Sequence, residues 1–276
     1  MANFSIDLPG RIRNFELPKN KPLLPLFESI VNSIYAIEDR QQKEKIEGLI
    51  NIEIIREPQY IIEGVGIDSS INQITGFKVT DNGIGFDETN MQSFLQSDST
   101  YRADKGGKGV GRFSWLKAFK SAHISSVFKD DGGWVKRDFD FTLDNKNIND
   151  SLTEAVGEYS DNRTTIELQE CYPQYKKNIP AKTETIASSI MHHCFIYLMS
   201  PTCPKITVRD EESSVCINDI FEAKIRREAE VVKFDINGEE FSLLHAKIED
   251  AALGNNKLYL FANERMVQES NIEKDI

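Results

Sequence analysis

Two glycine-rich stretches constrain this chain more than any other feature, DNGIG at 81–85 and GGKGVG at 106–111. The first follows an alternating apolar run, so a strand is expected to end at Asp81 and to present its carboxylate at a turn. Gly83 and Gly85 allow the backbone to turn with positive φ and to come close to a flat ligand. The sequence therefore predicts a ligand-contacting turn that carries one acid.

The second stretch precedes an apolar run with helical spacing (Phe113, Leu116, Phe119), which predicts a helix over 110–120. A glycine-rich loop that enters a helix N-terminus directs unpaired backbone N–H groups and the positive end of the helix dipole at one point. This arrangement suits an anion such as a phosphate chain. Taken alone, the pattern fits a flexible surface loop equally well.

Support comes from a predicted amphipathic helix that runs from about residue 23 to Asp39. Its apolar stripe consists of Leu23, Leu26, Phe27, Ile30, Val31 and Ile34. Glu28 and Asn32 lie four residues apart and share a helix face at the border of this stripe. Each alone could be a solvated border residue. Together they suggest an amide oxygen for Mg²⁺ and a carboxylate that orients or deprotonates a water for phosphoryl transfer.

The order of the predicted elements suits an α/β sandwich with helices on one face of a mixed or antiparallel sheet. Strands are predicted at 49–55, 123–128, 134–143 and 164–168, besides the one ending at Asp81, with a hairpin turn over 130–133 and a long helix over 179–199. Residues 1–20 fit a short edge strand or an arm. The polar span 88–105 is interpreted as a lid over the ligand, with a simple solvent loop as the alternative.

Prolines at 201 and 204 indicate a domain boundary, so we expect one domain over 1–200 and the start of another over 201–276. Beyond the boundary, short strands are predicted at 205–208, 231–236, 240–248, 257–261 and 265–267, with Asn237-Gly238 as a hairpin signal. A length of 276 residues leaves room for two modest cores.

Composition excludes several classes of protein. With 39% hydrophobic and 28% charged residues the chain is neither disordered nor built for a membrane. No apolar run approaches the ~20 residues that span a bilayer, and the N-terminus lacks the regions of a signal peptide, so a cytoplasmic location is expected. A net charge of −11 disfavours a broad basic surface for duplex DNA and leaves only a local patch for such binding.

The four cysteines show no close C-x-x-C pairing and are expected to be reduced, scattered thiols. A metal site at His192, His193, Cys194 and Cys203 is disfavoured, because adjacent histidines point to different sides of a helix and further ligands at metal spacing are missing.

Four motifs together resemble those of the GHKL ATPases, a family that includes type II topoisomerase ATPase domains, ninety-kilodalton heat-shock chaperones, sensor histidine kinases, MutL and MORC proteins. The resembling segments are ESIVNSIYA at 28–36, DNGIG at 81–85, GGKGVG at 106–111 and TTIEL at 164–168. Their order and spacing agree with the family across most of the first 200 residues. The resemblance implies a two-layer α+β sandwich of the Bergerat type, with ATP and Mg²⁺ as cofactors.

The resemblance also implies roles for individual residues. Glu28 would activate the attacking water, Asn32 would bind Mg²⁺, and Asp81 would accept a hydrogen bond from the adenine amino group. Gly83 and Gly85 would line the pocket of the base, and Thr164 would reach the adenine through a water. The β- and γ-phosphates would be held by the backbone amides of Gly107, Lys108, Gly109, Val110 and Gly111. Lys105 or Lys108 would add positive charge there.

Two positions depart from the family pattern. Tyr35 stands where the first motif usually has an aspartate, which alters the pocket rim, and Arg163 stands where a glycine usually precedes Thr164. LYLFANERMV at 258–267 resembles a strand and turn in the second domain of topoisomerase, MutL and MORC proteins. In those families a later lysine touches the γ-phosphate, and we expect it to lie outside this chain, in a longer protein or another subunit.

The favoured hypothesis is an ATPase in which the nucleotide closes the lid and brings two N-terminal domains together as a transient dimer, as part of a larger assembly for DNA handling or defence. A protein partner or a C-terminal effector domain is expected. The alternatives are a nucleotide-sensing module with little hydrolysis and a histidine kinase. The kinase needs a phosphoacceptor histidine upstream of Glu28, whereas all four histidines lie at 123 or later.

Overall fold

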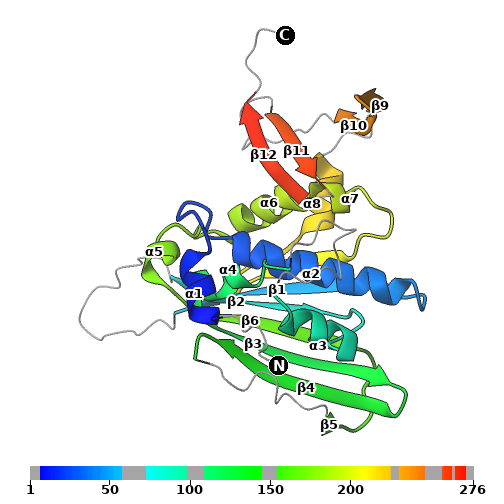
Figure 1. Ribbon diagram of the computed structural model, residues 1–276. Helices are drawn as coiled ribbons and strands as arrows, with labels where there is room; N and C mark the ends of the chain where they lie inside the picture. Colours follow the sequence, from blue (N-terminus) through cyan, green and yellow to red (C-terminus); the bar gives the residue numbers. More distant parts are fainter. Residues whose placement is uncertain are drawn as a thin grey trace, which may run out of the picture.

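The computed structural model describes residues 7–57, 73–97, 109–144, 154–224, 230–245, 257–262 and 265–271. The strands of its main sheet are β1 (Leu49–Arg56), β2 (Ile74–Asp81), β3 (Phe119–Asp130), β4 (Gly133–Thr142), β5 (Glu154–Ala155), β6 (Arg163–Cys171), β7 (Lys205–Arg209) and β8 (Ser214–Cys216). They form one eight-stranded sheet in the order β5-β4-β3-β6-β2-β1-β7-β8 (Figure 1). Neighbouring strands are antiparallel except β1 and β7, which are parallel. The predicted α+β class with a mostly antiparallel sheet is confirmed.

The helices are α1 (Leu8–Asn14), α2 (Leu24–Gln41), α3 (Glu88–Leu95), α4 (Phe113–Ala118), α5 (Pro173–Lys176), α6 (Thr183–His193), α7 (Phe195–Leu198) and α8 (Ile217–Lys224). Figure 1 shows α2 lying along the sheet with α1, α3 and α4 beside it. Buried side chains from these helices and from the strands join in one hydrophobic core. Within the described ranges, no helix is both long enough and apolar enough to cross a membrane.

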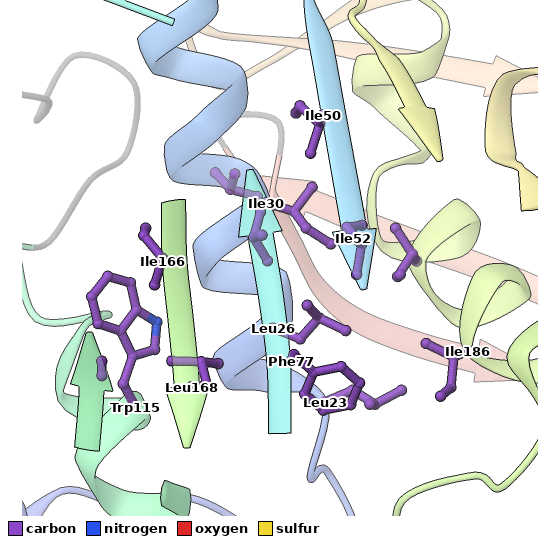
Figure 2. Close-up of a cluster of buried hydrophobic side chains, with 14 of the residues drawn as sticks. Leu23, Leu26, Ile30, Ile50, Ile52, Phe77, Trp115, Ile166, Leu168 and Ile186 are labelled. Atoms are coloured by element: carbon purple, nitrogen blue, oxygen red, sulfur yellow. The ribbon is translucent and has the colours of Figure 1, made fainter. Parts of the chain in front are cut away.

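The long helix α2 is amphipathic, as predicted. Pro25 lies in its first turn, where the missing N–H of proline costs no helical hydrogen bond. Leu26 and Ile30 are fully buried and lie over Ile52 of β1 and Phe77 of β2 (Figure 2). Burying a side chain of this size stabilises the fold by about 1.5–3 kcal/mol. The core therefore holds the face that carries Glu28 and Asn32 at a constant height above the sheet.

The strands predicted before residue 200 all have counterparts in the main sheet, and the hairpin turn over 130–133 is confirmed. Asp130 pairs with Gly133, whose φ of 122° is readily adopted only by glycine. The predicted helix over 110–120 extends too far, because α4 ends at Ala118. The next residue, Phe119, pairs with Cys171 as the first residue of β3, so sheet pairing overrides the helical spacing of the apolar residues.

Three further segments differ from their predictions. In the segment 1–20, expected as a short edge strand or an arm, residues 8–14 form α1, and residues 1–6 lie outside the described residues. Residues 88–95 of the expected lid form α3, which is capped at its N-terminus by the Asp87 carboxylate. The helix predicted over 179–199 begins only at Thr183 and is interrupted at Cys194, where φ is −92° and ψ is 13°. Part of the reason is tertiary, since the carbonyl of Ala181 accepts a hydrogen bond from Arg56 rather than from a helical neighbour.

The main sheet continues past the domain boundary expected near residue 200. β7 pairs with β1 and β8 pairs with β7, so the strand predicted at 205–208 belongs to this sheet and does not begin a separate one. Asp210 holds the β7–β8 turn in place by accepting hydrogen bonds from Arg56 at 2.8 Å and from Thr183 at 2.6 Å. Burial raises the pKa of Asp210, but these hydrogen bonds outweigh it and keep the pKa well below the usual value.

Two hairpins follow the main sheet in the chain, β9 (Glu230–Ile236) with β10 (Glu239–His245), and β11 (Lys257–Ala262) with β12 (Arg265–Asn271). Asn237 and Gly238 have φ values of 57° and 86°, which confirms the predicted turn between β9 and β10. Tyr259 of β11 stacks on His192 of α6 with ring centroids 6.4 Å apart.

Candidate functional site

The candidate site lies along one face of α2. Glu28, Asn32 and Ala36 are spaced four residues apart, so they lie in a row on this face. Ser33 lies beside the row and is buried. At a rise of 1.5 Å per residue, the row from Glu28 to Ala36 is about 12 Å long. The two glycine clusters contact opposite ends of it.

One end of the row contacts the second glycine cluster. The backbone of Gly111 lies directly against the carboxylate of Glu28, so a methyl group at Gly111 would overlap the Cδ, Oε1 and Oε2 atoms of Glu28. Asn32 donates from Nδ2 to Oε1 of Glu28 at 3.2 Å. Only a residue without a side chain fits at position 111 while Glu28 stays in this orientation.

The other end of the row contacts the first glycine cluster. Asp81, at the end of β2, accepts a hydrogen bond from the Ser33 hydroxyl at 2.7 Å and one from the Gly83 N–H at 2.8 Å. A Cβ at Gly83 would lie 2.7 Å from backbone and side-chain atoms of Ala36. Asp81 is 4% exposed, so these donors stabilise a carboxylate that has lost most of its water.

Residues from β3 and β6 complete the end of the site at the first glycine cluster. Thr164 is the cross-strand partner of Asp81, and its hydroxyl shares a 2.8 Å hydrogen bond with the hydroxyl of Ser126. Gly85 has a φ of 91°, and a Cβ there would lie 2.5 Å from the Cβ of Phe128. Both backbone conformation and space therefore require glycine at 85.

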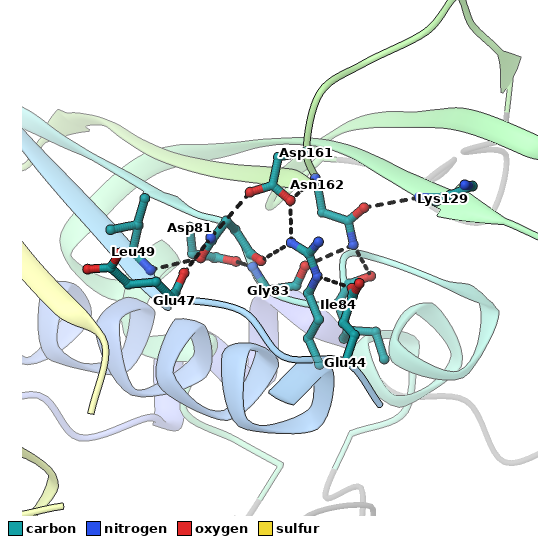
Figure 3. A network of polar contacts seen from close by, with 11 residues as sticks. Glu44, Glu47, Leu49, Asp81, Gly83, Ile84, Lys129, Asp161 and Asn162 are labelled. Atoms are coloured by element: carbon teal, nitrogen blue, oxygen red, sulfur yellow. Dashed lines mark hydrogen bonds and ion pairs between the residues drawn. The ribbon is translucent and has the colours of Figure 1, made fainter. Parts of the chain in front are cut away.

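A network centred on Arg40 holds the first glycine turn from the side of α2. The Arg40 guanidinium donates to the carbonyl of Asn82 at 2.7 Å and forms ion pairs with Asp161 at 2.6 Å and Glu44 at 2.5 Å (Figure 3). Burial lowers the pKa of Arg40, but its hydrogen bonds to Glu44 and Asp161 raise it overall. Arg40 therefore remains a cation that joins α2, the glycine turn and the segment before β6.

Two asparagines hold the same turn from the other sides (Figure 3). Asn82 accepts from the N–H of Leu49 at 2.8 Å and donates to the carbonyl of Glu47 at 2.9 Å, which joins the turn to the start of β1. Asn162 donates to the carbonyl of Gly83 at 3.1 Å. The turn is thus fixed by hydrogen bonds to its backbone and side chains before any ligand binds.

The loop of the second glycine cluster is described only in part. Gly109 has a φ of 64°, and Val110 and Gly111 lead through a turn into α4. Lys105, Gly107 and Lys108 lie outside the described residues. The side chain that follows this loop, Arg112, donates to the carbonyl of Gly109 at 2.9 Å.

Tyr35 does not lie at the rim of this site, as its place in the first motif suggested. It is fully buried, and its hydroxyl shares a 2.8 Å hydrogen bond with the hydroxyl of Tyr197 in α7. The departure from the family motif therefore serves packing between α2 and α7. Arg163, the other departure, is exposed, whereas its neighbour Thr164 is buried.

The structure thus brings together the described site residues that the sequence predicted: Glu28, Asn32, Asp81, Gly83, Gly85, Gly109, Val110, Gly111 and Thr164. Sequence reasoning missed Ser33, Arg40, Asp161 and Arg112. Ser33 had a local signal, since it is a polar residue next to Asn32 within the apolar part of a helix. Arg40 and Asp161 contact each other across more than 100 residues, and Arg112 reaches back to the carbonyls of Gly109 and Gln96, so no local pattern marks them.

The donor set around Glu28 fits a magnesium ion with its waters. Because Asn32 donates through Nδ2 to Glu28, its Oδ1 atom is directed away from the carboxylate and is available to a cation. Mg²⁺ prefers oxygen ligands, keeps several waters and needs few protein atoms when a phosphate chain supplies others. The residues present therefore fit this ion.

A scan against protein-family models and a search of curated proteins find no match for this chain.

Proposed function

We propose that this chain binds Mg²⁺ and ATP along α2 and hydrolyses the nucleotide, in the manner of the GHKL ATPases. The observation that carries the proposal is the arrangement on α2. A carboxylate lies against one glycine cluster and a second cluster with a buried acid lies about 12 Å further along the same helix face. This separation suits an extended adenine nucleotide whose base and terminal phosphate bind at opposite ends.

At the base end, Asp81 accepts the hydrogen bond that selects adenine. A carboxylate held by Ser33 and Gly83 has a defined orientation, and an ionised carboxylate is purely a hydrogen-bond acceptor. The exocyclic amino group of adenine is a donor, whereas guanine presents a carbonyl at the same place. Gly83 and Gly85 allow the base to approach the backbone closely.

At the phosphate end, Glu28 orients the attacking water and accepts its proton, and Asn32 holds the metal through Oδ1. When bound, Mg²⁺ neutralises the charge that develops on the phosphate oxygens. Backbone N–H groups of the segment that ends at Gly111 stabilise the same charge at the start of a helical turn. Glu28 contacts the backbone of Gly111, so the proposed proton acceptor lies next to these N–H donors.

Measuring the release of phosphate from ATP in the presence of Mg²⁺ tests the role of Glu28. We expect Glu28→Gln to bind ATP with unchanged affinity and to lose hydrolysis by about 100-fold or more, because only the proton acceptor is removed. Glu211→Gln, at an exposed position, is the matched control. Equal rates for wild type and Glu28→Gln would refute the assignment of the base. Binding of ATP by the wild type without measurable hydrolysis would instead indicate a nucleotide-sensing module.

Calorimetric titration tests the role of Asp81. We expect Asp81→Asn to weaken ATP binding by about tenfold or more, because a hydrogen bond to a charged acceptor is lost at a buried position. Asp131→Asn, in the exposed β3–β4 turn, is the control. Unchanged affinity of Asp81→Asn for ATP would defeat the adenine assignment, and equal affinity of the wild type for GTP would do the same.

We also propose that the bound nucleotide brings two copies of the chain together, as the family resemblance suggests. The segment 98–105 of the expected lid lies outside the described residues, so the support is the resemblance alone. Sedimentation with a non-hydrolysable ATP analogue is expected to show a dimer that is absent with ADP. A monomer under both conditions would contradict this part of the proposal.

A further inference from the structure

Arg112 joins three parts of the structure around the phosphate-side turn. Its guanidinium donates to the carbonyl of Gly109 at 2.9 Å and to the carbonyl of Gln96, just after α3, at 2.8 Å. The same group lies over two aromatic rings, 5.2 Å from the centroid of Phe94 and 5.1 Å from that of Phe113. The two hydrogen bonds use the two ends of the planar fork of arginine, Nη1 and Nη2, while the flat group lies over the rings.

The bond to Gly109 determines where the next amide points. A trans peptide is planar, so the carbonyl of Gly109 and the N–H of Val110 point in opposite directions. With the carbonyl held by Arg112, the N–H of Val110 is directed away from the guanidinium. Within the part of the chain that the structure describes, the N–H groups of Val110 and Gly111 have no hydrogen-bond partner. They remain available to a ligand.

The bond to Gln96 connects this turn with the base-side turn through α3. Asn90, near the start of α3, donates to the carbonyl of Gly85 at 2.9 Å. Arg137 further fixes the start of α3 by donating to the carbonyl of Phe86 at 3.0 Å. From Asn90 to Gln96 the chain advances by about 9 Å along the axis of α3. A short helix thus separates the two glycine turns by a constant distance.

We infer that Arg112 is a positioning residue that aims the Val110 N–H at the terminal phosphates and holds this turn at the correct distance from the base-side turn. The inference rests on the proposed function, since it concerns the triphosphate of the same site. It predicts that Arg112 affects the binding of the β- and γ-phosphates and leaves the binding of the base unchanged.

Arg112→Lys is the decisive variant, because it keeps the positive charge and most of the aliphatic side chain but cannot bond both carbonyls. In calorimetry with Mg²⁺, we expect the affinity for a non-hydrolysable ATP analogue to fall by about tenfold or more. The affinity for AMP should change by less than about twofold. The kcat for hydrolysis should fall as well. Arg209→Lys is the control, since Arg209 is exposed on β7 and pairs only with Glu53 among the described residues.

The outcomes separate the inference from the proposed function. Unchanged binding of the ATP analogue by Arg112→Lys, or an equal loss for AMP and the analogue, would overturn the inference while the proposed function stands. A wild-type protein that binds neither nucleotide would overturn both. If Arg112→Lys does not fold, hydrogen exchange in the wild type decides. The amides of Val110 and Gly111 should be protected by the ATP analogue and not by AMP, and equal or absent protection would overturn the inference.

Discussion

Replacing Gly111 by alanine should damage catalysis without damaging the fold. A methyl group at this position would overlap the terminal atoms of Glu28. Since non-bonded carbon atoms settle ~3.5–4 Å apart, the carboxylate would have to withdraw by more than ~1 Å. A displacement of this size at a catalytic group can cost about 100-fold in rate. We therefore expect kcat to fall by about 100-fold in Gly111→Ala.

The free energy of unfolding should change little in the same variant. Gly111 does not have a positive φ, so alanine fits its backbone and restricts the unfolded chain, which stabilises by about 0.4–1 kcal/mol. Moving the flexible end of Glu28 to another conformation costs about 0.5–1.5 kcal/mol. These effects nearly cancel. Urea denaturation and calorimetry with AMP should accordingly give values close to those of the wild type.

Gly157→Ala is the matched control, because a Cβ there would meet no atom within 4 Å and its φ is not positive. Hydrolysis should be normal in this variant. A double-mutant cycle with Glu28→Ala sharpens the test, since Gly111→Ala should have almost no further effect once the carboxylate is gone. A normal kcat for Gly111→Ala would refute the reasoning. So would a double variant whose loss of kcat equals the product of the two single losses.

Two further predictions concern the supports of the site and of the fold. Arg40→Lys has one nitrogen and cannot replace both the Nη1 contacts to the turn and Asp161 and the Nε contact to Glu44. It should therefore weaken the binding of AMP and of the ATP analogue alike by about tenfold in calorimetry, and an effect on the analogue alone would contradict this. Asp210→Asn should lower the free energy of unfolding by about 2 kcal/mol at pH 7, because bonds from Arg56 and Thr183 to a charged acceptor are weakened. Although burial raises the pKa of Asp210, hydrogen bonds lower it overall. The wild type should therefore lose its extra stability over Asp210→Asn as the pH falls below about 4. A difference in the free energy of unfolding that stays constant down to pH 3 in urea titrations would be inconsistent with this prediction.

Local patterns predicted the elements that carry the site. The period of the apolar residues in α2 identified both the helix and the face shared by Glu28 and Asn32, because side chains four residues apart must lie together on a helix. Alternation identified the strand that ends at Asp81 in the same way. These features depend on neighbouring residues alone, so the sequence was sufficient for them.

Elements whose limits depend on distant partners were predicted less well. α4 ends at Ala118 because Phe119 pairs with Cys171, and the apolar spacing of the segment contains no sign of that pairing. Likewise, β7 joins the main sheet through its parallel pairing with β1, although the prolines before it resemble a domain boundary. Long-range pairing overrode the helical spacing at Phe119, and at β7 it decided which sheet the predicted strand joins.

The sequence by itself determined which residues could form a nucleotide site, because the acid, the amide and the two glycine clusters are visible in short motifs. Only the tertiary structure decided that Gly111 lies against Glu28, that Ser33 donates to Asp81, and that Arg40 and Arg112 hold the two glycine turns. The physical reason is that these contacts join different elements of the fold, and for Arg112 this is its bond to Gln96 after α3. Such contacts exist only after the sheet has paired and α2 has packed onto it.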